Sequence, residues 1–154
     1  MSENPEILFY HLERQPLEQA LPMLVEKSLE RGWRALVRSG SEERLDSIDT
    51  ALWSYREDSF LPHGRDSESD AATQPVVLTT QTANPNGANV LFLTDRAPSD
   101  ALAGYERVVT MFDGRDDEAV AEARAFWKQA KDAGHKLTYW QQDGGGRWEK
   151  KAEA

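Results

Sequence analysis

Apolar residues along the chain follow two patterns, short continuous runs and helical spacings. Runs of four to six residues rich in Val, Leu, Ile and aromatic side chains are typical of buried strands. Such runs predict strands at 7–10, 33–38, 75–79, 90–93, 107–112 and 136–140. Apolar positions three and four residues apart predict helices between these runs. The helices are expected over about 17–31, 41–53 and 116–133, with Gly32 and Gly134 just after the first and the last.

The alternation of strands and helices predicts an α/β sandwich with a mostly parallel sheet. Pro22 interrupts the first helical pattern, so that helix either begins near Leu21, with Pro22 in its first turn, or kinks at Pro22. Residues 1–142 are expected to form one domain, in which 64–73 is an exposed loop rich in Asp, Ser and Glu. Residues 143–154 contain three consecutive glycines and are expected to be a flexible C-terminal tail, with Trp148 as a point where it can dock.

Composition and charge exclude several classes of protein. The 154 residues include no Cys, which excludes a disulfide framework, a thiolate zinc site and a Cys nucleophile. No apolar run is long enough for a transmembrane helix, and the first residues lack the pattern of a secretory signal, so we expect a cytoplasmic protein. The 27 Asp and Glu outnumber the 18 Lys and Arg, giving a net charge of −9. This charge argues against sequence-independent wrapping of a nucleic-acid backbone.

Motifs for nucleotide or hydrolytic chemistry are missing from the sequence. There is no G-x-G-x-x-G after the first strand, no phosphate-binding G-x-x-x-x-G-K-[ST] and no G-x-S-x-G. The histidines at 11, 63 and 135 lack the spacing of metal ligands, so we expect neither metal nor cofactor, with a site built by His11 and His63 as the lesser alternative. The acidic run 113–117 is interpreted as a strand-to-helix turn whose carboxylates stabilise the helix N-terminus.

The last predicted helix carries two different faces. At about 100° per residue, one side is small or apolar and is expected to pack on the sheet: Ala119, Ala123, Phe126, Ala130 and Ala133. The opposite side collects Arg124, Trp127, Lys128 and Lys131, with Val120 beside Trp127. One interpretation is a solvated polar face with an incidental Trp. The other is an apolar notch with a positive rim, which suits an acidic peptide ending in a hydrophobic residue and a free carboxylate.

A second aromatic region lies between 52 and 64. It contains Trp53, Tyr55, Phe60 and Leu61 near a helix end and a turn. These residues either close the helix against the core or form an aromatic surface for a protein partner.

Taken in order, these residues and several short motifs resemble the chi subunit of bacterial DNA polymerase III holoenzyme. The likeness extends from about Ile7 to Gln142, and its most specific part is Leu-Trp followed by Ser-Phe-Leu-Pro-His. The motifs that carry the resemblance are Phe9-Tyr10, Ala51-Leu52-Trp53, Ser59-Phe60-Leu61-Pro62-His63, Gln74-Pro75-Val76, Asn86-Gly87-Ala88, Arg107-Val108-Val109, Phe112-Asp113-Gly114-Arg115-Asp116, Ala123-Arg124, Trp127-Lys128 and Gly134.

The resemblance implies a three-layer Rossmann-like sandwich, with helices on both faces of the sheet and no functional nucleotide site. It also implies an accessory subunit of the clamp-loader assembly rather than a catalyst. Chi proteins bind the acidic, Phe-terminated tail of single-stranded DNA-binding protein, and this site falls on Arg124, Trp127 and Lys128. A further family cation falls on Val120, for which Lys131 can compensate.

The surface that binds the psi subunit in some members of the family falls on Trp53 and Phe60, which can serve psi, a helicase or only the core. Two other functions stay open at this point. One is a direct single-stranded nucleic-acid binder, and the other is a small hydrolase that uses His63, Asp58 or Asp113.

Overall fold

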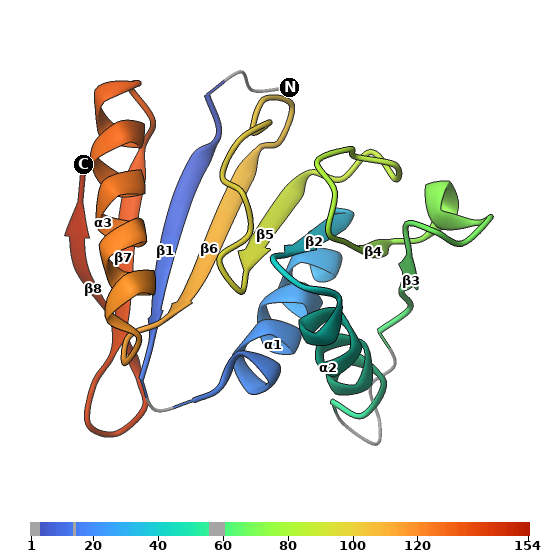
Figure 1. The fold of residues 1–154 in the computed structure, drawn as a ribbon, viewed down its shortest axis with the longest axis horizontal. Helices are drawn as coiled ribbons and strands as arrows, with labels where there is room; N and C mark the ends of the chain where they lie inside the picture. The colour runs from blue at the N-terminus through green and yellow to red at the C-terminus, as the bar shows by residue number, and fades with distance from the viewer. Residues whose placement is uncertain (1–3, 14, 56–60) are drawn as a thin grey trace.

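A computed structural model describes residues 4–13, 15–55 and 61–154. Its centre is an eight-stranded sheet with the order β3-β4-β2-β5-β6-β1-β7-β8, in which β8 alone is antiparallel to its neighbour (Figure 1). The strands are β1 (Glu6–Leu12), β2 (Ala35–Ser39), β3 (Gly64–Arg65), β4 (Val76–Thr79), β5 (Val90–Thr94), β6 (Arg107–Asp113), β7 (Leu137–Gln142) and β8 (Trp148–Glu153). The helices are α1 (Leu17–Glu30), α2 (Glu42–Trp53), α3 (Asp117–Asp132) and a short 3₁₀ turn, η1 (Ala71–Thr73).

Helices cover both faces of the sheet, which confirms the predicted three-layer α/β sandwich. Figure 1 shows α3 on one side and α1 and α2 on the other. Two apolar clusters fill the two interfaces, and the sheet separates them. One joins Leu21 and Ile48 of the paired helices to Leu8 and Val37, and the other joins Ala123 of α3 to strand residues such as Phe9 and Leu91. The central strands are buried on both faces, which is why their sequences are continuous apolar runs.

Side-chain caps explain where two of the helices begin. Ser41 Oγ accepts a hydrogen bond of 3.2 Å from the backbone N–H of Arg44 at the start of α2. The Asp116 carboxylate accepts from the N–H groups of Glu118 and Ala119 at 3.0 and 3.3 Å, at the start of α3. The acidic run before α3 therefore caps a helix, as the sequence predicted.

The helix α1 begins earlier than one of the two alternatives from the sequence, a start near Leu21. It starts at Leu17, with Pro22 buried inside it, so the alternative start near Leu21 is wrong. Proline has no N–H to donate to the carbonyl of Glu18, and the helix keeps it because the ring is buried in the core under α1.

Two segments predicted to be irregular are built into the sheet. In the stretch 64–73, Gly64 and Arg65 form β3 and pair with β4, and Ala71 is buried in η1, while residues 66–70 are exposed. The predicted flexible tail is also wrong, because Trp148–Glu153 form β8 and pair with β7. The Trp148 ring packs edge-on against Tyr10 at 5.0 Å between ring centroids, so the sheet extends past residue 142.

This packing predicts that Trp148 anchors the C-terminal strand. Trp148→Ala should lower the free energy of unfolding by about 1–3 kcal/mol, less than for a fully buried Trp because the side chain is half-buried. Urea denaturation followed by circular dichroism measures the change. Lys150→Ala on the same strand removes only an exposed ion pair and should cost less than about 1 kcal/mol. Equal effects of the two substitutions would contradict a docked strand.

Candidate functional site

One flank of α3 carries the residues that the sequence singled out for peptide binding. Arg124, Lys128 and Lys131 are exposed, and Val120 and Trp127 are half-buried between them and the sheet. The alanines at 119, 123 and 130 are buried and set the helix on the sheet, whereas Ala133, predicted to pack with them, is exposed. All five predicted binding residues therefore lie along one side of one helix.

Trp127 differs from the sequence prediction in how it sits. It was expected to face away from the core, but its ring packs edge-on against Phe9 at 5.2 Å and against Tyr139 at 6.0 Å. The residue lies about 60° around the helix from the middle of the buried alanine stripe, which places it at the boundary between core and solvent. Its aromatic ring thus forms a wall of the flank, rather than an isolated exposed indole.

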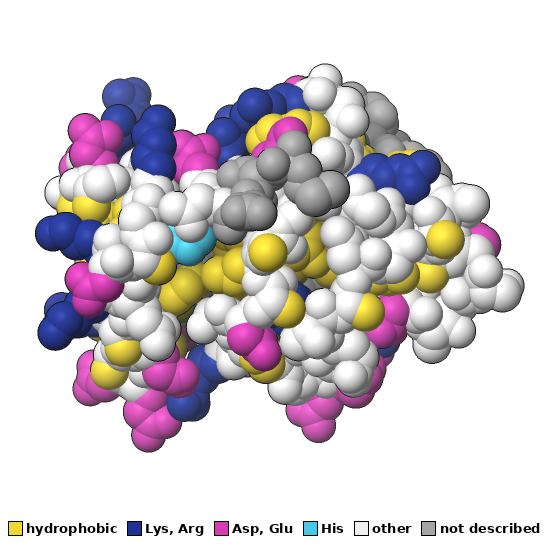
Figure 2. Space-filling model, turned by 90° about the horizontal axis from the view of Figure 1, so that it is seen from above, with side chains coloured by type: hydrophobic (Ala, Val, Ile, Leu, Met, Phe, Trp, Pro, Cys, Tyr) yellow, Lys and Arg dark blue, Asp and Glu magenta, His cyan; other side chains and the backbone are white. Residues whose placement is uncertain are grey.

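The three cations of this flank are not neutralised within the described residues. None of them has a carboxylate within ion-pair distance there, whereas many other basic residues do: Arg44, Arg65, Arg96, Arg107, Arg115, Lys136, Lys150 and Lys151. Figure 2 shows dark-blue Lys and Arg side chains interspersed with magenta Asp and Glu along the left margin, the side where α3 and β8 lie in Figure 1. The flank is locally positive although the chain as a whole is strongly acidic.

Tyr139 connects the flank to the sheet beneath it. His11 Nδ1 lies 2.7 Å from the Tyr139 hydroxyl, and His11 Nε2 lies 3.0 Å from a carboxylate oxygen of Glu13. Burial raises the pKa of Tyr139, and the nearby positive charge of Arg124 acts in the opposite direction. The floor of the flank is therefore an aromatic group in electrostatic reach of one of the proposed binding cations.

The second aromatic surface lies on the other helical layer, at the end of α2. Trp53 is 55 % exposed, and its ring stands 4.8 Å from the ring of the buried His63. His63 Nε2 contacts Asp49 Oδ1 at 2.5 Å, and its Nδ1 lies 2.7 Å from the carbonyl oxygen of Leu61. Phe60, predicted to share this surface, lies outside the described residues.

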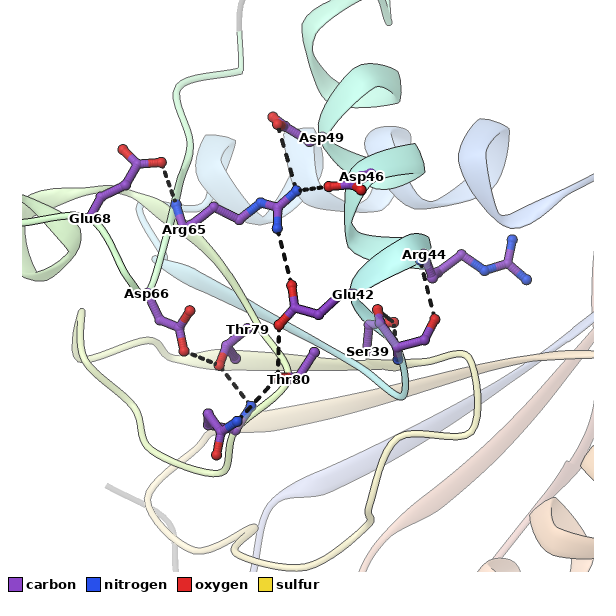
Figure 3. Close-up of polar contacts among 12 residues, drawn as sticks. Ser39, Glu42, Arg44, Asp46, Asp49, Arg65, Asp66, Glu68, Thr79 and Thr80 are labelled. Carbon is purple, nitrogen blue, oxygen red and sulfur yellow. Dashed lines mark hydrogen bonds and ion pairs between the residues drawn. The ribbon is translucent and has the colours of Figure 1, made fainter.

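An ion-pair cluster holds this region against α2. Figure 3 shows the Arg65 guanidinium reaching three carboxylates of the helix, at 2.5 Å from Asp46, 3.4 Å from Glu42 and 4.0 Å from Asp49. Asp49 thus contacts both Arg65 and His63, which fixes the segment 61–65 one helical turn from Trp53.

The described residues proposed for a hydrolase or for a histidine metal site do not lie together in the structure. His63 lies beside α2 on one face of the sheet, and His11 packs against Phe112 and Tyr139 on the other. Asp113 ends β6, separated from β3 by three strands, and Asp58 lies outside the described residues. Among the described residues there is no group of three or more His, Asp or Glu that could hold a metal ion.

Comparisons with known proteins give the family of this chain. Residues 5–138 match the family model described as DNA polymerase III chi subunit, HolC. The chain belongs to the DNA polymerase III chi subunit family. One relative is the protein named "Probable DNA polymerase III subunit chi" of Rickettsia prowazekii (strain Madrid E), 28% identical over 91 residues. That alignment covers 59% of this chain and 54% of the relative, so the chain spans about half the length of the curated relative it matches.

A chi subunit is by name a part of DNA polymerase III, so family membership associates this chain with DNA replication. None of the helices in 4–13, 15–55 and 61–154 is long and apolar enough to cross a membrane.

Sequence analysis of this chi-family chain missed the floor of the α3 flank. Phe9, His11 and Tyr139 come from two different strands, and only the pairing of β1 with β7 brings them under the helix. A signal was available in the alternation of Phe9 and His11 along one strand, because residues two apart face the same side of a sheet. The sequence did not show which neighbouring strand completes the group.

The electrostatic interaction between Arg124 and Tyr139 makes a prediction about titration. Arg124→Ala should raise the pKa of Tyr139 further, because the substitution removes the positive charge that favours the phenolate. Tyrosinate absorbance against pH measures the shift, and Tyr139→Phe identifies which of the four tyrosines is responsible.

The raised pKa of Tyr139 also predicts how the free energy of unfolding depends on pH. A raised folded-state pKa contributes stability below the unfolded value of about 10, and this contribution is lost as the pH rises through the folded pKa. In Arg124→Ala the loss attributable to Tyr139 should still begin near the unfolded pKa, which the substitution does not change, and should extend to a higher pH because the folded pKa is higher. A matched substitution at Arg115, which is exposed and precedes α3, should leave the Tyr139 titration unchanged.

Proposed function

We propose that this chi-family protein binds the acidic C-terminal tail of single-stranded DNA-binding protein through the α3 flank. The observation that carries the proposal is the group of three cations without carboxylate partners in the described chain, Arg124, Lys128 and Lys131, beside the half-buried Trp127 and Val120. Cations left unpaired on an acidic protein favour an anionic partner, and the apolar wall next to them suits a terminal hydrophobic side chain.

The apolar contact is expected to supply much of the affinity. An exposed ion pair is worth about 0–1 kcal/mol, so the three cations together supply about 0–3 kcal/mol. Burying a Phe side chain is worth about 1.5–3 kcal/mol. We expect a dissociation constant in the micromolar range, which corresponds to a binding free energy of about −8 kcal/mol.

The proposed role is to tether the clamp-loader assembly of DNA polymerase III to template coated by single-stranded DNA-binding protein. Several tails on one coated strand raise the effective concentration of binding sites, so a micromolar contact gives a longer attachment without new interactions. In this proposal the protein acts as an accessory subunit in the cytoplasm and contributes binding rather than a catalytic step, with DNA contacted mainly through the coating protein.

Fluorescence anisotropy with a labelled acidic peptide ending in Pro-Phe tests the tail site. We expect micromolar binding that falls at least about ten-fold in Arg124→Ala and in Trp127→Ala, a loss of about 1.4 kcal/mol or more. Removing the terminal Phe from the peptide should have an effect at least as large, since that side chain carries the apolar contact.

Arg115→Ala is the matched control, because Arg115 is exposed and lies outside the flank. Absence of binding at about 100 μM, well above the expected constant, would refute the tail site. Binding that survives loss of the Phe but falls steeply with salt would instead favour a direct nucleic-acid or polyanion binder.

We further propose that Trp53 belongs to a second partner surface, for which the sequence also singles out Phe60, and that this surface serves another replication protein such as psi, a clamp-loader subunit or a helicase. An indole more than half exposed is an unusual use of a large apolar side chain, and interfaces favour Trp as an anchor. This surface and the α3 flank lie on opposite layers, so both partners can bind together.

Trp53→Ala should separate the two surfaces. The substitution should abolish co-elution with the clamp-loader subunits or helicase of the same organism in gel filtration, while the tail peptide keeps its affinity within about two-fold. Arg124→Ala should show the reverse pattern. A Trp53→Ala protein that still co-elutes with each of these partners would contradict the second surface.

A further inference from the structure

The second flank of α3 carries the opposite charge from the proposed tail site. Glu118 and Glu122 lie on it, and both carboxylates contact Arg96 from the loop after β5, at 3.2 and 2.5 Å. The helix therefore separates a positive flank, beside β7, from an acidic flank that faces the loop 95–99.

A cavity of about 310 Å³ opens beside this acidic flank, at the carboxyl ends of β1, β5 and β6. Its floor is apolar and includes Leu12, Leu93, Met111, Ala123 and Phe126. The volume is within the range of small-ligand sites and holds one large side chain with part of its backbone.

The sheet topology makes this end of β1 and β6 a natural binding position. The chain leaves β1 through α1 on one face and travels to β2, whereas it leaves β6 through α3 on the other face and travels to β7. The two connections diverge above adjacent strands, and ligands of open α/β sheets bind in the crevice formed at such a switch point.

The charges around the cavity select against an anion. Among the described residues that line it, six are acidic and three are arginines. Each arginine is already close to a carboxylate: Arg44 to Glu18 at 2.7 Å, Arg96 to Glu122, and Arg115 to Asp113 at 3.4 Å. The N–H groups at the start of α3 that would receive a phosphate are taken by Asp116. The remaining field favours a cation.

The wall of the cavity contributed by the loop after β5 is held in place from within the core. The Arg38 side chain is fully buried, and its Nη1 donates to the carbonyl oxygens of Pro98 and Asp100, both at 2.8 Å. Asp95 accepts a hydrogen bond of 2.6 Å from Ser41 Oγ at the start of α2. The cavity is therefore a preformed feature rather than a gap beside a free loop.

We propose that this cavity is a docking site for a basic-apolar peptide segment of a protein partner, one with an aromatic or large aliphatic side chain next to lysine or arginine. The apolar side chain fills the floor, and the flanking cation lies among the acidic residues of the rim. This site is separate from the α3 flank and from Trp53, so it stands or falls independently of the tail-binding proposal.

The test uses two acetylated and amidated peptides, Ser-Lys-Phe-Lys-Ser and its acidic counterpart Ser-Glu-Phe-Glu-Ser, titrated into the ¹⁵N-labelled full chain and followed by NMR chemical shifts. The basic peptide should give saturable shifts at Leu12, Met111 and Ala123, with an affinity at least about ten-fold higher than the acidic one. Comparable shifts with both peptides, shifts confined to the positive flank, or no saturable shift up to about 5 mM would overturn the proposal.

Two variants assign the binding to the cavity. The double substitution Glu13→Gln and Asp113→Asn removes two rim charges on exposed side chains and should weaken the basic peptide at least about five-fold. Glu30→Gln, at the far end of α1, is the control and should have no effect. Ala123→Leu fills the floor and should block the peptide as well. If Ala123→Leu fails to fold, the charge variant alone decides, and unchanged binding in it overturns the site.

Discussion

The close packing of α3 on the sheet is the constraint on which both ligand-binding proposals depend. Three alanines, at 119, 123 and 130, are the buried contact positions of the helix, and such small side chains let the helix axis approach the strands closely. Larger neighbours on either side, Phe126 and Trp127, then pack against Phe9 of β1. These buried contacts fix the helix on the sheet, and its two flanks can therefore carry different charges.

The sheet has the strand geometry of a nucleotide-binding protein but lacks its phosphate-binding chemistry. The strand order provides a switch point between β1 and β6, and α3 begins at the carboxyl end of β6. In a dinucleotide-binding protein a glycine-rich turn would leave the helix N–H groups for phosphate. Here the Asp116 carboxylate occupies them, and acidic side chains surround the opening. The same backbone arrangement therefore repels phosphate and leaves an acidic, apolar-floored cavity.

On the other face, buried polar contacts position an exposed aromatic residue. The short β3 strand contributes Arg65, whose ion pairs with α2 carboxylates bring His63 against Asp49 and under Trp53. Single exposed ion pairs contribute little, but several charges that share one partly buried guanidinium act as a network. The network holds the segment 61–65 against α2, and a surface that is already ordered loses less entropy when a partner binds.

The sequence alone determined the α/β class, the parallel strands and the charged flank of α3, because these follow from local periodicity and from composition. Motif order likewise pointed to the chi family, which the family model confirmed. Tertiary structure decided what local patterns do not encode. Pairing of β7 with β8 turned a glycine-rich, charged terminus into an edge strand, since Trp148 gains its partner Tyr10 only in the folded sheet. Pairing of β1 with β7 places Phe9 and Tyr139 under Trp127, so a side chain expected in water packs against the sheet instead. Local patterns do not encode this contact, because Phe9 and Tyr139 lie more than a hundred residues apart in the chain.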